Sequence, residues 1–129
     1  MTAPGRWWLV SIARTVRRSV GPVNLHVTTA TVGDREVVSV EGVLDLASLA
    51  TLHDALNRAA QQHRGSTLVV DLDGVSAIDD SGLGIVLGAA ANARQSGGDL
   101  ELVVGDGPIR RRLEQTRLDR AVSVRATIA

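Results

Sequence analysis

From residue 25 onward the hydrophobic positions follow two periods, one typical of strands and one typical of helices. The runs LHVTTATV (residues 25–32) and EVVSVEGV (residues 36–43) are rich in β-branched residues and are separated by Gly-Asp-Arg, so they predict an antiparallel hairpin. The next segment, SLATLHDALNRAAQQH, repeats apolar residues at helical spacing and predicts a helix that ends at Gly65. The apolar stripe of this helix is Leu49, Leu52, Leu56 and Ala59.

The second half of the chain alternates strand and helix. The apolar runs TLVVDL (residues 67–72) and LELVVG (residues 100–105) predict strands, and AVSV (residues 121–124) predicts a short last strand. Right-handed crossovers make the first two strands parallel, buried neighbours with helices packed on the sheet. A further helix is expected from Pro108 to about Thr116. The stripe of the helix between the two apolar strands is Leu83, Val86, Leu87, Ala90 and Ala93. We therefore expect one α/β domain with a mixed sheet, residues 25–129.

Residues 1–24 form a separate N-terminal extension in this interpretation. If RWWLVSIARTVRRSV (residues 6–20) is helical, its apolar side chains share one face and Arg14, Arg17 and Arg18 lie opposite, until Gly21 and Pro22 end the helix. The extension is thus predicted to be a basic amphipathic helix. Two interpretations of this helix are open. It is either frayed or docked on its own domain, or it binds a membrane surface or a partner.

Composition and charge limit the function classes. Four Arg and no acid lie in residues 1–24, and the remaining ten Arg against fourteen Asp and Glu leave residues 25–129 at −4, which argues against nucleic-acid binding. The chain has no Cys, hence no disulfide and no thiolate chemistry, which fits a cytoplasmic protein. No apolar run reaches the roughly 18 residues that span a bilayer.

The segment VVDLDGVSAIDDSGLGIVLG (residues 69–88) places four aspartates and two serines between two apolar runs, so we expect an acidic surface loop between a strand and a helix. Ser81 lies where this loop becomes helical, the usual N-cap position. A phosphate there would meet free backbone N–H groups, and its charge of about −1.5 to −2 would lie beside Asp79 and Asp80. The segment suits a phosphorylation switch on a protein interface, and a plain serine cap fits the local physics equally well.

Other chemistries find less support in the same segment. In a phosphatase Asp71 would be the nucleophile and Asp73 the acid/base, but the chain has no Lys to hold the transferring phosphoryl group. The glycine spacing matches neither a dinucleotide fingerprint nor a P-loop, and Ser81 lacks a nucleophile elbow. The three histidines show no zinc spacing, and the aspartates do not form a calcium loop. We expect no catalytic residue, no cofactor and no metal site.

The run VVDLDGVSAIDDSGLGIVLGAAANARQSGGDLELV resembles the core of the STAS family, the sulfate-transporter and anti-sigma-factor-antagonist domains. Bacterial regulators of that family carry D-S-S-G-L-G where a helix opens. VEGVLDLASLATLHDAL is similar to the family's G-E-L-D segment and first helix, and LEQTRLDRAVSV is similar to its closing helix and strand. The similarity covers about residues 25–125.

The resemblance implies an anti-sigma factor antagonist that is not itself an enzyme. In that family the unphosphorylated protein binds an anti-sigma factor, usually a serine kinase, and so frees a sigma factor. The kinase phosphorylates the serine before the glycine of the motif, which here is Ser81, and a phosphatase restores binding. The expected contact residues are Asp45, Ser48, Asp79, Asp80, Ser81, Gly82, Leu83 and Ile85, with Leu83 alternatively in the core. A STAS scaffold or sensor that is never phosphorylated is the alternative.

The sequence departs from the family pattern at three positions. Asp80 replaces the first serine of the motif's pair and leaves a permanent negative charge beside Ser81. Val43 stands where the family often has Glu, although Asp45 is kept, and Arg117 replaces a frequent Gly in the closing helix. IRRRLE (residues 109–114) is expected to be a solvated basic helix face.

Overall fold

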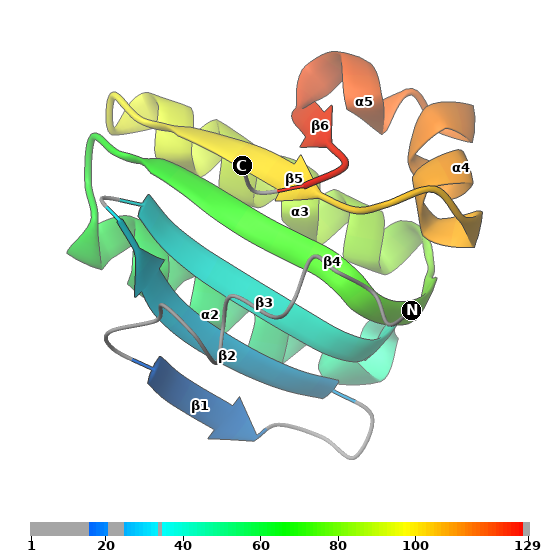
Figure 1. Ribbon diagram of the computed structural model, residues 1–129, viewed down its shortest axis with the longest axis horizontal. Coiled ribbons are helices and arrows are strands. Elements are labelled where there is room, and N and C mark those ends of the chain that lie inside the picture. The colour runs from blue at the N-terminus through cyan, green and yellow to red at the C-terminus, as the bar shows by residue number, and fades with distance from the viewer. Residues whose placement is uncertain (1–15, 21–24, 34, 128–129) are drawn as a thin grey trace.

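A single mixed sheet organises the chain, of which the computed structural model describes residues 16–20, 25–33 and 35–127. Its six strands follow the order β1-β2-β3-β4-β5-β6 (Figure 1). The pairs β1–β2 and β2–β3 are antiparallel, and the pairs β3–β4, β4–β5 and β5–β6 are parallel. The strands are β1 Val16–Val20, β2 Leu25–Val32, β3 Arg35–Leu44, β4 Thr67–Ile78, β5 Asp99–Val103 and β6 Ser123–Arg125.

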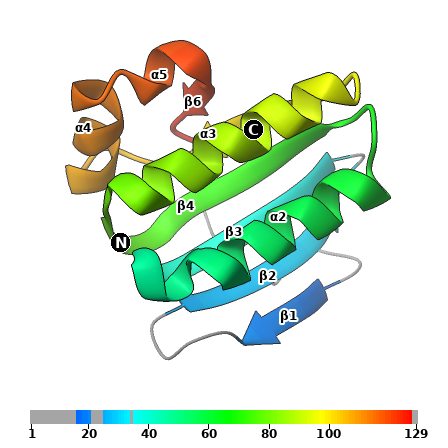
Figure 2. The same ribbon diagram turned by 180° about the vertical axis from the view of Figure 1, so that it is seen from behind.

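The described helices pack on one face of this sheet (Figures 1 and 2). Each parallel crossover moves one strand further in the same direction, so right-handed connections place the helices on the same side. None of these helices is both long and apolar enough to cross a bilayer. They are the 3-10 helix η2 Leu46–Ser48 and the α-helices α2 Leu49–Gln62, α3 Asp80–Gln95, α4 Pro108–Gln115 and α5 Leu118–Ala121.

The main core lies between the helices and the sheet and is built from Leu, Val, Ile and Ala, because the chain has no Phe or Tyr. Alternate residues of the central strands point into it, as the period of two along a strand requires. The predicted hairpin at 25–43 and the predicted parallel neighbours at 67–72 and 100–104 are confirmed. Fully buried members include Leu25, Leu44, Leu52, Leu56, Leu68, Leu72, Leu100, Leu102 and Leu113.

The N-terminal helix predicted over residues 6–20 is wrong for Val16–Val20, which form strand β1. Val16 pairs with Ala30 and Val20 pairs with His26, so β1 extends the sheet beyond β2. An unpaired edge of β2 offers a row of backbone donors and acceptors, and pairing satisfies them over five residues. Residues 1–15 and 21–24 lie outside the described residues, and the domain boundary at residue 24 stays a prediction.

Strand β4 is longer than predicted and includes part of the segment that we expected to be a surface loop. Asp71 lies on this strand and is fully buried, against the expectation that the aspartates all reach the surface. Its carboxylate accepts a hydrogen bond from the backbone N–H of Asp73 at 2.9 Å. A buried carboxylate is tolerated when hydrogen bonds satisfy it, which the sequence pattern does not reveal.

One member of the predicted α3 stripe is wrong, because Leu87 is 43% exposed. Leu83, Val86, Ala90 and Ala93 are buried as expected. Residue 87 follows Val86 by about 100° around the helix, which turns its side chain away from the sheet. The core therefore uses a narrower stripe of α3 than the sequence suggested.

The carboxyl end of α3 is fastened to β5 and α5 by Arg94. Its Nε donates to Asp99 Oδ1 at 2.9 Å, and one of its terminal nitrogens donates to the carbonyl of Ala121 at 2.6 Å. The backbone N–H of Leu100, followed by the Arg94 guanidinium, lowers the pKa of Asp99, and desolvation opposes this in part. The contact ties the last helices to the sheet.

Arg117, which replaces a frequent Gly of the family, joins α4 to α5 in the left-handed region with φ 62° and ψ 20°. A side chain in this region crowds the following carbonyl, whereas glycine does not. The backbone shape thus explains why glycine suits the position.

We expect Val86→Ala to lower the free energy of unfolding by about 1–3 kcal/mol, because it removes fully buried methyl groups. The neighbouring Leu87→Ala is the matched control and should change it by less than about 0.5 kcal/mol. Urea unfolding followed by far-ultraviolet circular dichroism measures both. Equal losses would place Leu87 in the core and contradict the packing described above.

Arg117→Gly should raise the free energy of unfolding by about 0.5–1 kcal/mol, because relief of left-handed strain outweighs the added freedom of the unfolded chain. Arg120→Gly, the same change within α5, should lower it by about 1 kcal/mol. Thermal unfolding of the two variants beside the wild type gives the sign of each effect. A loss of stability in both variants would contradict the strain at Arg117.

Candidate functional site

The predicted site residues gather at one edge of the sheet because β3 and β4 are parallel and end together. Leu44 at the end of β3 is in register with Ile78 at the end of β4. The backbone N–H of Asp79 then donates to the carbonyl of Leu44 at 3.0 Å. As a result η2, which follows β3, lies beside the first turn of α3, which follows β4 (Figure 2).

Asp79, not Ser81, caps the amino end of α3. Its Oδ1 accepts a hydrogen bond from the N–H of Gly82 at 3.0 Å, and its carbonyl accepts the first helical bond, from Leu83, at 3.1 Å. The N-cap predicted at Ser81 is therefore wrong, because an aspartate two residues earlier already satisfies the third helical N–H. Ser81 is the second helical residue and is half-buried at the surface of the first turn.

Gly82 lets this first turn pack closely against the end of β3. A Cβ at this position would lie 2.9 Å from the Cβ of Leu44 and 3.0 Å from Cγ1 of Ile78. Gly82 is itself buried, and so is Leu83, which is 7% exposed and belongs to the core cluster. Gly82 and Leu83 therefore lie beneath the surface and hold the first turn of the helix against the sheet. The alternative placement of Leu83 in the core is confirmed.

The turn that begins at Asp45 is closed by a reciprocal capping box. Asp45 Oδ1 accepts hydrogen bonds from the N–H groups of Ala47 at 3.1 Å and Ser48 at 3.2 Å, while the Asp45 N–H donates to Ser48 Oγ at 3.1 Å. Ser48 is 2% exposed, and its hydroxyl also donates to the carbonyl of Val43 at 2.8 Å. Ser48 thus shapes the turn, and its burial contradicts a direct side-chain contact with a partner.

Asp80 forms an ion pair that the sequence did not suggest. One terminal nitrogen of Arg112 on α4 donates to Asp80 Oδ1 at 2.8 Å. IRRRLE is therefore not only a solvated basic face, because one of its arginines reaches the first turn of α3. No local spacing signals this contact, since the two residues meet only when α4 packs beside α3. An exposed pair of this kind adds about 0–1 kcal/mol, but it offsets the permanent charge beside Ser81.

The surface around Ser81 also carries an exposed hydrophobic side chain that sequence reasoning missed. Leu46, the first residue of η2, is 73% exposed. Leu46 stands in the run LDLASL, whose pattern of hydrophobic and polar residues favours a place in the core. Only the geometry of the turn reveals that its side chain is exposed. Ile85, one turn beyond Ser81, is half-buried and packs against the core. Large exposed leucines beside polar groups are the kind of anchor that protein interfaces use.

A groove of about 440 Å³ between α2 and α3 begins one turn beyond Ser81. Gly84 and Gly88 face open space, so no side chain of theirs fills it. The groove continues the surface of the first turn along the two helices. Its lining residues are His53, Leu56, Asn57, Gly84, Ile85, Gly88, Ala89, Ala91 and Asn92.

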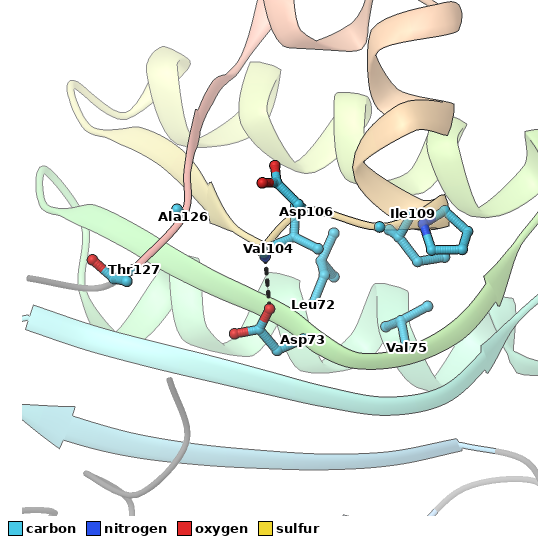
Figure 3. A pocket seen from close by; sticks show the side chains of 11 residues that line it. Leu72, Asp73, Val75, Val104, Asp106, Ile109, Ala126 and Thr127 are labelled. Atoms are coloured by element: carbon cyan, nitrogen blue, oxygen red, sulfur yellow. Dashed lines mark hydrogen bonds between the residues drawn. The ribbon is translucent and has the colours of Figure 1, made fainter. Parts of the chain in front are cut away.

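A second hollow of about 340 Å³ opens where β5 meets the start of α4 (Figure 3). Asp73 lies at its wall and accepts a hydrogen bond from the N–H of Gly105 at 2.8 Å, while Leu72, Val75 and Ile109 supply apolar walls. Asp71, the nucleophile in the phosphatase alternative, is fully buried, which puts it out of reach of a phosphate ester. Among the described residues no three His, Asp or Glu side chains are arranged to hold a metal ion.

Known structures share this architecture. An anti-sigma factor antagonist from Mycobacterium paratuberculosis is 23% identical with a TM-score of 0.74, covering 85% of this chain and 92% of that one. The anti-sigma factor antagonist SpoIIAA in its unphosphorylated form is 17% identical with a TM-score of 0.59, covering 85% and 87%. The Bacillus cell fate determinant SpoIIAA in its phosphorylated form is 17% identical with a TM-score of 0.56, covering 85% and 90%.

Sequence comparison assigns the family over most of the chain. None of the curated proteins matches it. The family model described as "Mlab, STAS domain" matches residues 27–125, which run from β2 through β6. The match includes the Asp45 turn and the first turn of α3, and so takes in the residues that carry the resemblance. The chain therefore belongs to the STAS domain family.

Proposed function

We propose that this protein is an anti-sigma factor antagonist, which binds an anti-sigma factor and so releases a sigma factor for transcription. The observation that carries the proposal is the position of Ser81 in a STAS fold. It lies at the surface of the first turn of α3, beside the Asp45 turn and the exposed Leu46. Solved structures of similar fold are anti-sigma factor antagonists, which supports this role.

The proposed contact surface is defined as the switch surface: Asp45, Leu46, Asp79, Asp80, Ser81 and Ile85. Leu46 supplies an apolar anchor at one side and the groove along α3 continues the surface at the other. Three of the six residues of the switch surface carry carboxylates, so a partner with basic or hydrogen-bond-donating groups would fit it best. The first-turn N–H groups of Asp80 and Ser81 have no acceptor within the helix and remain for a ligand or solvent.

Phosphorylation of Ser81 by the bound anti-sigma factor, acting as a serine kinase, would end the association. The phosphate adds about −1.5 to −2 charge next to Asp79 and Asp80 in the chain, and it must lose water to enter an interface. Helix N–H groups and the helix dipole stabilise the phosphate locally, so the domain stays folded. The switch therefore acts by repulsion and desolvation at a preformed surface, and a phosphatase that removes the group restores binding. This cycle operates in the cytoplasm, and the partner supplies ATP.

A scaffold or sensor that is never phosphorylated is the second candidate, and Asp80 is the observation that favours it. Asp80 places a carboxylate where the family motif has a hydroxyl, so the charge next to Ser81 is permanent. Arg112 holds that carboxylate at 2.8 Å and partly neutralises it. In this alternative the charge of the first turn never changes, and Ser81 is a helix residue that receives no phosphate.

We expect the wild type and Ser81→Ala to retain a common anti-sigma factor from lysate of the source cells, and Ser81→Glu to lose it at least tenfold. The retained protein, purified and given Mg²⁺ and ATP, should add the mass of one phosphate to the wild type and none to Ser81→Ala. Ser66→Glu, an exposed serine at the other end of β4, is the charge control and should bind as the wild type does. Equal retention by all four baits without phosphate transfer would favour the scaffold instead.

Leu46→Ala should weaken binding of the identified partner about tenfold or more without lowering the melting temperature, because Leu46 makes little contact within its own chain. Leu87→Ala is the matched control, an exposed leucine two turns along α3 on the strip that begins with Asp80. Isothermal titration calorimetry compares the two variants. A larger loss with Leu87→Ala would move the interface away from the Asp45 turn.

A further inference from the structure

The sheet has a second buried layer on the face that carries no described helix. Because side chains alternate along a strand, residues between those of the main core point to this other face. Ala30, Val37, Val69 and Val103 form a separate hydrophobic cluster there, which we call the second cluster. The described helices lie on the opposite side of the sheet (Figures 1 and 2).

These side chains are buried as deeply as the main core. Val37 and Val69 are 0% exposed and Val103 is 1% exposed. Asp71 on the same face is also 0% exposed, and Ser39 is 1% exposed. Neighbouring side chains on one face of a sheet stand alongside one another. They shield a central residue from water at its sides but not from above. Burial this complete therefore needs a cover in addition to these neighbours.

The charged side chains of the same face cover only part of it. Glu101 on β5 pairs with Arg35 at 3.3 Å and with Arg125 at 3.8 Å. This ion-pair group lies beside Val69, which is in register with Glu101. Ser39 and Asp71 are paired two residues further along the strands, and both are equally buried. These ion pairs thus do not account for the whole cover.

We propose that residues 1–15 pack across the helix-free face and bury the second cluster. The register of β1 places Val16 in line with Ala30, Val37 and Val69, so the preceding chain joins the sheet at the level of this cluster. From β1 to β4 there are three strand spacings, roughly 14 Å. Fifteen residues reach up to about 50 Å when extended, enough to turn and run back over the face. Every other segment outside the described residues has four residues or fewer.

The chemistry of the segment matches the face that it would cover. Residues 7–10 are Trp-Trp-Leu-Val, and two tryptophans alone bury some 300–500 Å². The only charged side chains of residues 1–15 are Arg6 and Arg14. A segment with so few charged side chains suits a face whose centre is the apolar second cluster.

This placement gives the extension a role inside the domain. It covers the side of the sheet opposite to α2 and α3, and so it leaves the switch surface free. It is an intramolecular alternative to the membrane-docking and partner-docking interpretations of the basic extension. The inference does not depend on the proposed function, because it concerns only the chain's own core.

Tryptophan fluorescence tests the inference directly, because Trp7 and Trp8 are the only tryptophans and the chain has no Tyr or Phe. In the native full-length protein we expect blue-shifted emission with weak quenching by acrylamide. Both signals should change in urea together with the far-ultraviolet circular dichroism. Native emission equal to that of the unfolded chain would overturn the proposal. Shielding that depends on protein concentration, or that develops only on anionic vesicles, would also overturn it.

Nitroxide labels decide which face the tryptophans lie on, since the chain has no Cys of its own. His26→Cys and Ser123→Cys place exposed labels on the helix-free face, at β2 and β6, and Arg58→Cys places the control label on α2. At least one sheet-face label should quench native emission more than twofold more strongly than the control. Quenching by the α2 label equal to or stronger than that by both sheet-face labels would overturn the placement.

Discussion

Parallel pairing of β3 with β4 is the constraint on which the site depends. It brings the carboxyl ends of two strands to one edge, where the Asp79 N–H meets the Leu44 carbonyl at 3.0 Å. The Asp45 turn and the first turn of α3 then become neighbours although they lie more than thirty residues apart in the chain. Gly82 allows the close contact, because a Cβ there would press on Leu44. Loss of this pairing would separate Asp45 and Leu46 from the residues of the switch surface at the start of α3.

The strands follow one another across the sheet in chain order, and the two faces of the sheet differ as a result. Each right-handed crossover advances in the same direction, so the helices all pack on one side and present Ser81 at its edge. The other side holds a second cluster that needs a different cover. The division separates the proposed switch surface from the face that our inference assigns to residues 1–15. Changes in the extension can then alter stability without touching the switch surface.

The two carboxylates at the start of α3, those of Asp79 and Asp80, take part in different interactions. Asp79 is committed to the helix cap through Gly82, and Asp80 is held by Arg112. A phosphate on Ser81 would thus be a charge without an assigned counter-ion, in a place where helix N–H groups tolerate it but a partner must desolvate it. In the proposed switch, a single phosphate would therefore change binding strongly while the fold remains intact.

The sequence by itself determined the αβ alternation, the hairpin, the parallel strands and the position of Ser81 near the start of a helix, because local periodicity and the family motif encode these features. Tertiary structure decided the rest. Val16–Val20 became a strand because β2 offered an open edge, and Asp71 stayed buried because β4 continued beyond the predicted loop. Ser48 turned inward, Leu46 turned outward and Arg112 met Asp80 only when turns and helices packed. Burial and pairing depend on neighbours distant in the chain, and no window of local sequence contains them.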